Sequence, residues 1–93
     1  MNIIKLISEN LLDQVYDPNY LNRVRVFHKD NQLSPEVTQA GLSDVHKWVR
    51  EEASSHPDIS AEQISMALND PFEKVRVNAM KHPMLQLNIS PKL

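Results

Sequence analysis

Apolar residues recur along this chain at intervals of three and four residues, the spacing of one face of an α-helix. The first segment carries them at Ile3, Ile4, Ile7, Leu11 and Val15, and the next at Tyr20, Val24 and Phe27. The sequence has neither the alternating runs typical of strands nor an Asn-Gly or Asp-Gly hairpin signal. The pattern therefore predicts an all-α chain.

Capping residues and prolines indicate where these helices begin and end. A possible N-cap directly precedes a proline at Asp17, Ser34 and Asp70. Capping-box spacing joins Ser60 to Gln63 and Asp70 to Glu73, and Ser43 or Asp44 can cap the helix that carries Trp48. Pro57 and Pro83 disfavour helix at the histidines before them. We expect helices over residues 3–15, 18–28, 35–42, 45–54, 61–68 and 71–81, and no regular structure over 86–93.

A second regularity has a much longer period. Leu6, Leu33 and Ile59 each begin a copy of one pattern, in which Glu follows after 3 residues, Asp after 11 and Arg after 17. The copies are offset by 27 and then by 26 residues. Such a period is typical of stacked helical repeats, which usually present a binding surface. We expect a single helical-repeat domain over 1–93, with repeats at about 4–30, 31–56 and 57–82 and a partial repeat or tail at 83–93.

The second and third copies are the most alike. Residues 33–57 and 59–83 align without a gap and share 9 identities in 25 positions. The identical pairs are Ser34/Ser60, Glu36/Glu62, Leu42/Leu68, Asp44/Asp70, Val49/Val75, Arg50/Arg76, Ala53/Ala79, His56/His82 and Pro57/Pro83. The first copy keeps the phase of the charged residues but has Lys29-Asp30 in place of His-Pro, and terminal repeats commonly diverge in this way.

The repeated string Val-Arg-x-x-Ala-x-x-His-Pro, at 49–57 and again at 75–83, resembles the leucine-rich repeat variant (LRV) family and is similar to HEAT-type repeats. The resemblance covers residues 33–87, whereas residues 1–32 match only in phase. It implies a short right-handed α-solenoid of about three and a half helix–turn–helix repeats, and no general activity. One member of the family carries a cysteine-ligated iron–sulfur segment, but this chain has no cysteine, so that cofactor does not carry over.

Composition narrows the class of protein. The 93 residues suit one domain, and the lack of cysteine excludes disulfides, thiolate metal sites and a cysteine nucleophile. The net charge is −2 with both signs interspersed, so no overall field attracts nucleic acid or an acidic membrane. The chain has no apolar run that could span a bilayer and no signal segment. We expect a soluble, cytoplasmic protein.

Three Asp–Arg pairs with a spacing of six residues could be read as acid–base or anion-binding groups. They are Asp17 with Arg23, Asp44 with Arg50, and Asp70 with Arg76. A pair that recurs in every repeat indicates scaffolding, because a catalytic site is singular. We predict a ladder in which each Asp caps the second helix of its repeat and each Arg reaches the loop of a neighbouring repeat, fixing the angle between them.

The four histidines do not form a metal-binding pattern. His56 and His82 share a repeat phase, so they should lie about 10 Å apart, too far to share one zinc ion. The chain also lacks a Gly-x-Ser-x-Gly elbow and a glycine-rich phosphate loop, since Gly41 is its single glycine. We therefore expect no catalytic residues, no metal site and no cofactor.

Trp48 is the strongest candidate for a binding residue. Its equivalent in the next repeat is Lys74, which should be solvated, and tryptophan is enriched at binding hot spots. His46, Lys47 and Glu51 would then form a polar rim, with Lys74 in support. The alternative is that Trp48 belongs wholly or partly to the core, because it lies on the same helix face as Val45, Val49 and Glu52.

The favoured hypothesis is a protein–protein interaction module, acting as a small regulator, adaptor or inhibitor, with a phage or mobile-element accessory factor as one such case. The second hypothesis is nucleic-acid binding along a stripe of basic residues, namely Arg23, Arg25, Lys47, Arg50, Lys74 and Arg76. The apolar residues near both termini could instead dock a partner or a second copy of the chain, or the tail could fold back over the last repeat.

Overall fold

The computed structural model describes residues 11–88, and every regular element among them is a helix. A helical segment covers residues 11–14. It is followed by α2 (Tyr20–Val26), α3 (Pro35–Leu42), α4 (Lys47–Ser54), α5 (Ala61–Ala67), α6 (Glu73–Lys81) and α7 (Pro83–Asn88). The prediction of an all-α chain is confirmed for this part, in which no helix has the length and apolarity needed to cross a membrane.

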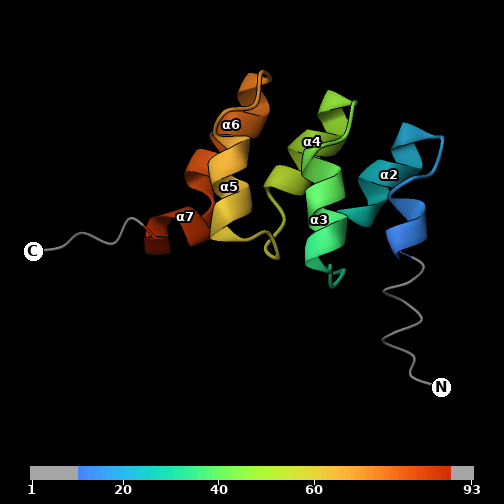
Figure 1. Cartoon of the computed structure of the whole chain (residues 1–93), viewed down its shortest axis with the longest axis horizontal. Helices are drawn as coiled ribbons and strands as arrows, with labels where there is room; N and C mark the ends of the chain where they lie inside the picture. The colour runs from blue at the N-terminus through green and yellow to red at the C-terminus, as the bar shows by residue number, and fades with distance from the viewer. Residues whose placement is uncertain (1–10, 89–93) are drawn as a thin grey trace, which may run out of the picture.

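The helices form two rows that follow the chain order (Figure 1). One row contains α2, α4 and α6, in which α4 packs against both others, and the second row contains α3 and α5. Across the rows, α3 packs on α4 and α5 packs on α6, while α7 packs against both α5 and α6. The body measures 49 × 30 × 17 Å, so it is elongated in the direction in which the helix pairs succeed one another.

The core lies between the two rows and uses equivalent positions of successive repeats. Val26, Ala53 and Ala79 are completely buried, and so are Val49 and Val75. Small or β-branched side chains at these positions let α2, α4 and α6 approach one another closely. The expected apolar phase is thus confirmed. In the tail, Met84 and Leu85 pack against this core, which agrees with the alternative in which the tail folds back over the last repeat.

The expected starts are correct for α3 and α5. Ser34 caps α3, with Pro35 in its first turn, and Ser60 forms a complete capping box with Gln63. Gln63 is also buried against the preceding repeat, where its side-chain amide donates to the Pro35 carbonyl at 3.2 Å and its oxygen lies 3.0 Å from the Thr38 hydroxyl. One residue therefore both begins a helix and joins two repeats.

The expected starts are wrong for the other row of helices. Asp17, Asp44 and Asp70 are not N-caps; that position belongs to Asn19, His46 and Phe72, and Phe72 makes no side-chain cap bond. Each aspartate instead accepts from the backbone N–H two residues later, at 2.8 Å in all three turns. The helices begin two residues later than expected because these carboxylates close the preceding turn.

Two of the three arginines of the predicted Asp–Arg ladder reach the aspartate of the neighbouring repeat. Arg23 Nε donates to Asp44 Oδ2 at 2.8 Å and its Nη2 to Oδ1 at 3.2 Å. Arg50 binds Asp70 in the same two-pronged manner, at 2.8 and 3.4 Å. The third nitrogen, Nη1, turns back to the carbonyl of the aspartate in its own repeat, at 2.7 Å for Arg23 and 2.9 Å for Arg50. Each arginine thus fixes its own turn and the next repeat together.

The buried histidines make a second ladder on the opposite side of the helix pairs. His82 Nε2 lies 2.8 Å from the His56 carbonyl, and His56 Nε2 lies 3.2 Å from the His28 carbonyl. The Nδ1 atom of each ring accepts from the backbone N–H two residues later. His28 makes this turn in the first repeat, so it, rather than Lys29, is the structural counterpart of the other two.

The single glycine is required by close packing. A Cβ atom built on Gly41 would lie 2.1 Å from Cζ of Phe27, a buried ring of the preceding repeat. In the next repeat the positions of Gly41 and Phe27 hold Ala67 and Ser54, so the glycine and the ring are replaced together. Gly41 therefore admits Phe27 into the core between α2 and α3.

The two ends of the described chain differ from the expected helix bounds. Residues 86–88 were expected to lack regular structure, but they belong to α7, which runs to Asn88. The expected helix over residues 3–15 is described only from residue 11, where Leu11 and Val15 are buried. Ile3, Ile4 and Ile7 and residues 89–93 lie outside the described part of the chain.

Candidate functional site

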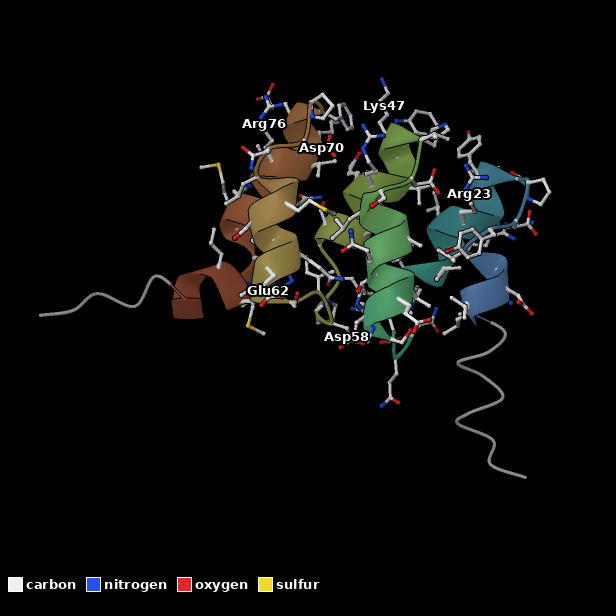
Figure 2. The ribbon with its side chains drawn as sticks, in the orientation of Figure 1. Arg23, Lys47, Asp58, Glu62, Asp70 and Arg76 are labelled. Atoms are coloured by element: carbon white, nitrogen blue, oxygen red, sulfur yellow. The ribbon has the colours of Figure 1, made fainter. Side chains whose placement is uncertain are left out.

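The N-terminal ends of α2, α4 and α6 bring aromatic rings together along one edge of the molecule, where Figure 2 labels Arg23, Lys47 and Arg76. We call Tyr20, His46, Lys47, Trp48 and Phe72 the aromatic edge. The rings of Tyr20 and His46 stack with centroids 4.0 Å apart and planes 9° from parallel. Trp48 is tilted against both, at 5.8 Å from Tyr20 and 5.3 Å from His46. The three rings form one cluster that spans two repeats.

Local hydrogen bonding holds this cluster in place. His46 is the N-cap of α4, and its Nδ1 atom accepts from the backbone N–H of Trp48 at 3.1 Å. The backbone N–H of His46 in turn donates to Asp44, the carboxylate that Arg23 holds from the preceding repeat. The Asp–Arg ladder therefore sets the position of the histidine ring, and the ring supports one side of the tryptophan.

Trp48 is 48% exposed, and its neighbour Val45 is 94% exposed. Of the residues expected on the same helix face as Trp48, Val49 is buried and Val45 is exposed, so Trp48 is only partly covered and is not a full member of the core. Leu21, at the repeat position of Trp48, is also exposed. The edge thus presents apolar side chains to solvent from two successive repeats.

The aromatic edge continues into the third repeat through a cation–π contact. The Lys47 ammonium lies 5.0 Å from the centroid of the Phe72 ring. This contact orients a cation and an aromatic face at the outer surface, and such pairs contribute about 0.5–1 kcal/mol at exposed sites. Lys74 is exposed one repeat away from Trp48. Glu51 is half-buried, and its carbonyl accepts from Asn78 at 2.9 Å.

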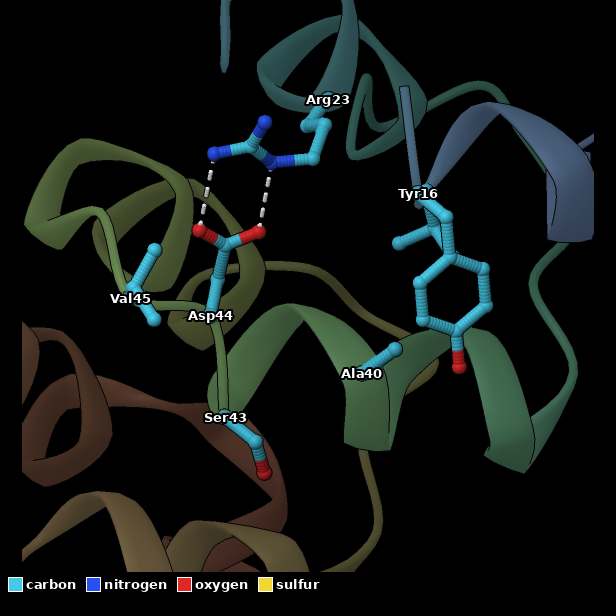
Figure 3. A pocket seen from close by; sticks show the side chains of 7 residues that line it. Tyr16, Arg23, Ala40, Ser43, Asp44 and Val45 are labelled. Carbon is cyan, nitrogen blue, oxygen red and sulfur yellow. Dashed lines mark hydrogen bonds and ion pairs between the residues drawn. The ribbon is translucent and has the colours of Figure 1, made fainter. Parts of the chain in front are cut away.

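A hollow of about 420 Å³ opens beside this edge, and the Arg23–Asp44 pair forms part of its wall (Figure 3). Tyr16 and Ala40 lie across from Val45 and Asp44 in this view. The remaining lining residues are Val15 and Ser43. The hollow joins an apolar wall to one ion pair, and both Tyr16 and Val45 are exposed at its rim.

Of the predicted binding residues, His46 and Trp48 belong to the ring cluster and Lys47 lies over the Phe72 ring, while Glu51 and Lys74 take no part in these ring contacts. Sequence reasoning missed Tyr20, which it assigned to an apolar helical stripe, and Phe72. Repeat register contained the signal: Asn19, His46 and Phe72 are equivalent, and so are Tyr20, Lys47 and Glu73. The ring stack joins positions from two such sets, so neither set reveals it alone.

The histidine and carboxylate side chains of the described residues are the groups that could bind a metal ion. No group of three or more His, Cys, Asp or Glu side chains within residues 11–88 is arranged to hold a metal ion. His56 and His82 are buried, and both ring nitrogens of each are engaged with backbone groups. Every buried side-chain nitrogen or oxygen in this part has a hydrogen-bond partner.

Comparisons of the chain with protein-family models, with curated proteins and with solved structures gave no match.

Proposed function

We propose that this chain is a non-catalytic protein-binding module, a small regulator, adaptor or inhibitor that contacts its partner through the aromatic edge. The observation that carries the proposal is the half-exposed Trp48, supported from below by the Tyr20–His46 stack. A rigid, partly exposed tryptophan contributes a large contact area at little cost in side-chain entropy, and such residues dominate binding energy at interfaces.

The surroundings of Trp48 fit this role. Leu21, Val45 and Tyr16 extend the apolar surface on both sides of the ring, and Lys47 adds a polar group held by Phe72. An apolar centre with a polar rim is the usual anatomy of a protein interface. The hollow between Tyr16 and Val45 adds an open recess to this surface.

We also infer that the helix pairs form a right-handed α-solenoid of about three and a half repeats, similar in plan to LRV and HEAT arrays. Two contacts that recur from repeat to repeat support this: the Arg23–Asp44 and Arg50–Asp70 pairs, and the histidine-to-carbonyl bonds. A periodic scaffold of this kind presents side chains from successive repeats along one edge.

Nucleic-acid binding along the basic stripe has less support. The side chains of Arg23 and Arg50 are only 14% and 15% exposed, and each is committed to an aspartate. Lys47 is directed over the Phe72 ring. Electrostatic binding to a phosphate backbone requires several free cations. The ion pairs of Arg23 and Arg50 remove two of the six cations that form the stripe.

The test uses wild-type protein, a Trp48→Ala variant and a Met80→Ala control. Met80 is an exposed apolar residue on α6, outside the aromatic edge. Each protein is immobilised and used to capture proteins from the native lysate. Any partner that depends on Trp48 is then purified, and its dissociation constant is measured by calorimetry.

We expect Trp48→Ala to weaken binding by about 2 kcal/mol, roughly thirtyfold, and Met80→Ala to leave it unchanged. Both variants should retain the helical circular dichroism of the wild type. A partner bound equally by all three proteins would exclude the aromatic edge as the interface. Recovery of nucleic acid alone, with binding lost as salt is raised, would instead favour the basic stripe.

A further inference from the structure

The Asp–Arg ladder has an unused donor at one end. Arg23 and Arg50 use Nε and Nη2 for the aspartate of the next repeat and Nη1 for the carbonyl of their own turn. Arg76 keeps the second part of this arrangement, with Nη1 donating to the Asp70 carbonyl at 2.7 Å. Its Nε and Nη2 atoms have no acceptor among the side chains of residues 11–85 or the described backbone, although the same atoms hold a carboxylate in both earlier repeats.

The other end of the ladder has an unused acceptor. Asp17 occupies the repeat position of Asp44 and Asp70, whose Oδ2 atoms each accept from an arginine Nε at 2.8 Å. Asp17 Oδ1 accepts from the backbone N–H of Asn19 at 2.8 Å and from the Asn22 side chain at 3.2 Å. In the part of the chain that the structure describes, Asp17 Oδ2 has no donor.

The space beside Asp17 can receive a side chain. A hollow of about 290 Å³ opens there, lined by Gln14, Asp17, Asn22 and Arg25. Asn22 lies at the repeat position of Val49 and Val75, both completely buried. The first repeat therefore has a polar group where later repeats have core, which suits a face that accepts a charged group.

We propose that a second copy of this chain binds head to tail, with its Asp17 accepting two hydrogen bonds from Arg76 of the first copy. Both residues lie on the edge that carries the ladder, and Figure 2 shows Arg76 and Arg23 at opposite ends of that edge. α7 packs on α5 and α6 at this same end of the molecule, and it lies below α6 in the view of Figure 1. The contact would continue the existing ladder from one molecule to the next.

One charge in the hollow must be accommodated. Arg25 has the sign of the incoming Arg76, and its Nη1 lies 3.3 Å from the Asn22 side-chain oxygen. The repeat position of Arg25 is held in the third repeat by Asn78. The side-chain amide of Asn78 donates to the Glu51 carbonyl of the preceding repeat at 2.9 Å. Arg25 would donate in the same way to backbone carbonyls on α6 of the first copy, and so contribute to the contact.

A contact between two different faces is heterologous, and it leaves one donor and one acceptor open at the ends of every assembly. Association should therefore give a series of species whose mean mass rises with protein concentration. It should also weaken as salt is added, because the contact depends on partly exposed charges. A closed dimer would instead reach a plateau at twice the mass of the chain.

The experiment measures the mean mass of the 93-residue chain by analytical ultracentrifugation over a wide concentration range at low salt. We expect Arg76→Asp and Asp17→Arg each to prevent association when studied alone. An equimolar mixture of the two should associate again, because each contact then regains one arginine and one aspartate. Lys74→Asp and Asp13→Arg change the net charge equally at exposed sites outside the contact, and they should behave like the wild type.

Circular dichroism and the melting temperature show whether each variant is folded. If charge reversal at Arg76 prevents folding, Arg76→Gln keeps one donor for the Asp70 carbonyl and should weaken association about tenfold or more. A wild-type chain that stays monomeric at the highest concentration would overturn the proposal. So would folded charge-reversal variants that still associate, or a mixture that does not.

Discussion

Replacing Gly41 by alanine should destabilise this protein, although the same change usually stabilises a helix. Gly41 lies in α3, and alanine is favoured over glycine within helices by about 1 kcal/mol. The added Cβ atom would lie 2.1 Å from Cζ of Phe27, and 2.6 and 2.8 Å from its two Cε atoms. A carbon–carbon contact normally lies at about 3.5–4.0 Å, so the ring has to move by more than 1 Å.

Rotation of the Phe27 ring cannot relieve this overlap, because Cζ lies on the axis about which the ring turns. The whole side chain or the whole of α3 must shift instead, and overpacking of a buried core costs about 1–3 kcal/mol, occasionally more. With three ring atoms in conflict, we take the upper part of that range. After the gain in helix propensity, Gly41→Ala should lower the free energy of unfolding by about 1–2 kcal/mol.

The assay is urea unfolding followed by circular dichroism, with Trp48 fluorescence as a second probe of the same transition. A loss of about 1–2 kcal/mol corresponds to a fall in melting temperature of roughly 4–16 °C for a domain of this size. Phe27→Leu removes Cζ and is the matched partner change. The double variant should be more stable than the sum of the two single effects predicts, because each change relieves the conflict that the other creates. Gly41→Ala protein as stable as the wild type would refute the packing argument.

Three further changes test the contacts between repeats. Arg50→Ala leaves the almost buried Asp70 carboxylate unpaired and should lower the free energy of unfolding in urea by about 2–4 kcal/mol. The control Arg25→Ala should lower it by about 0.5 kcal/mol or less. Equal effects of the two changes would show that the ladder has no structural role. His82→Ala removes a buried donor to the His56 carbonyl and should cost about 1–3 kcal/mol, measured by thermal melting. Gln63→Ala breaks both the capping box and the link to the preceding repeat. Backbone amides at the start of α5 should therefore exchange with solvent faster than in the wild type. Unchanged protection of these amides would contradict this role.

The periodic part of the fold could be predicted from the sequence. Leu33, Ile59, Val49 and Val75 recur at one spacing, and all four are buried. The repeat phase also indicated that arginines reach a neighbouring repeat, as Arg23 and Arg50 do, whereas it left open whether Trp48 is exposed or part of the core. These predictions succeeded because a repeated position has the same environment in every copy, so comparing copies separates core from surface.

The starts of α2, α4 and α6 could not be predicted in this way. Asp17 and Asp70 have the local sequence of N-caps, and nothing within a few residues contradicts that reading. The Asp70 carboxylate binds Arg50, which lies 20 residues earlier in the chain. This ion pair is stronger than a cap hydrogen bond because both partners are charged. Capping rules consider only neighbours in sequence, so they predicted an N-cap where Asp70 instead binds an arginine of the preceding repeat.

The sequence by itself determined the all-helical class, the length of the repeat and the residues that face the core, because all three follow from periodicities that backbone geometry imposes. Only the tertiary structure showed that Gly41 makes room for the Phe27 ring and that Tyr20 stacks on His46. It also showed that His28 makes the same turn as His56 and His82. Each of these depends on two residues from different helices meeting at a particular distance. That distance is set by how the repeats stack, which no single segment of the chain encodes.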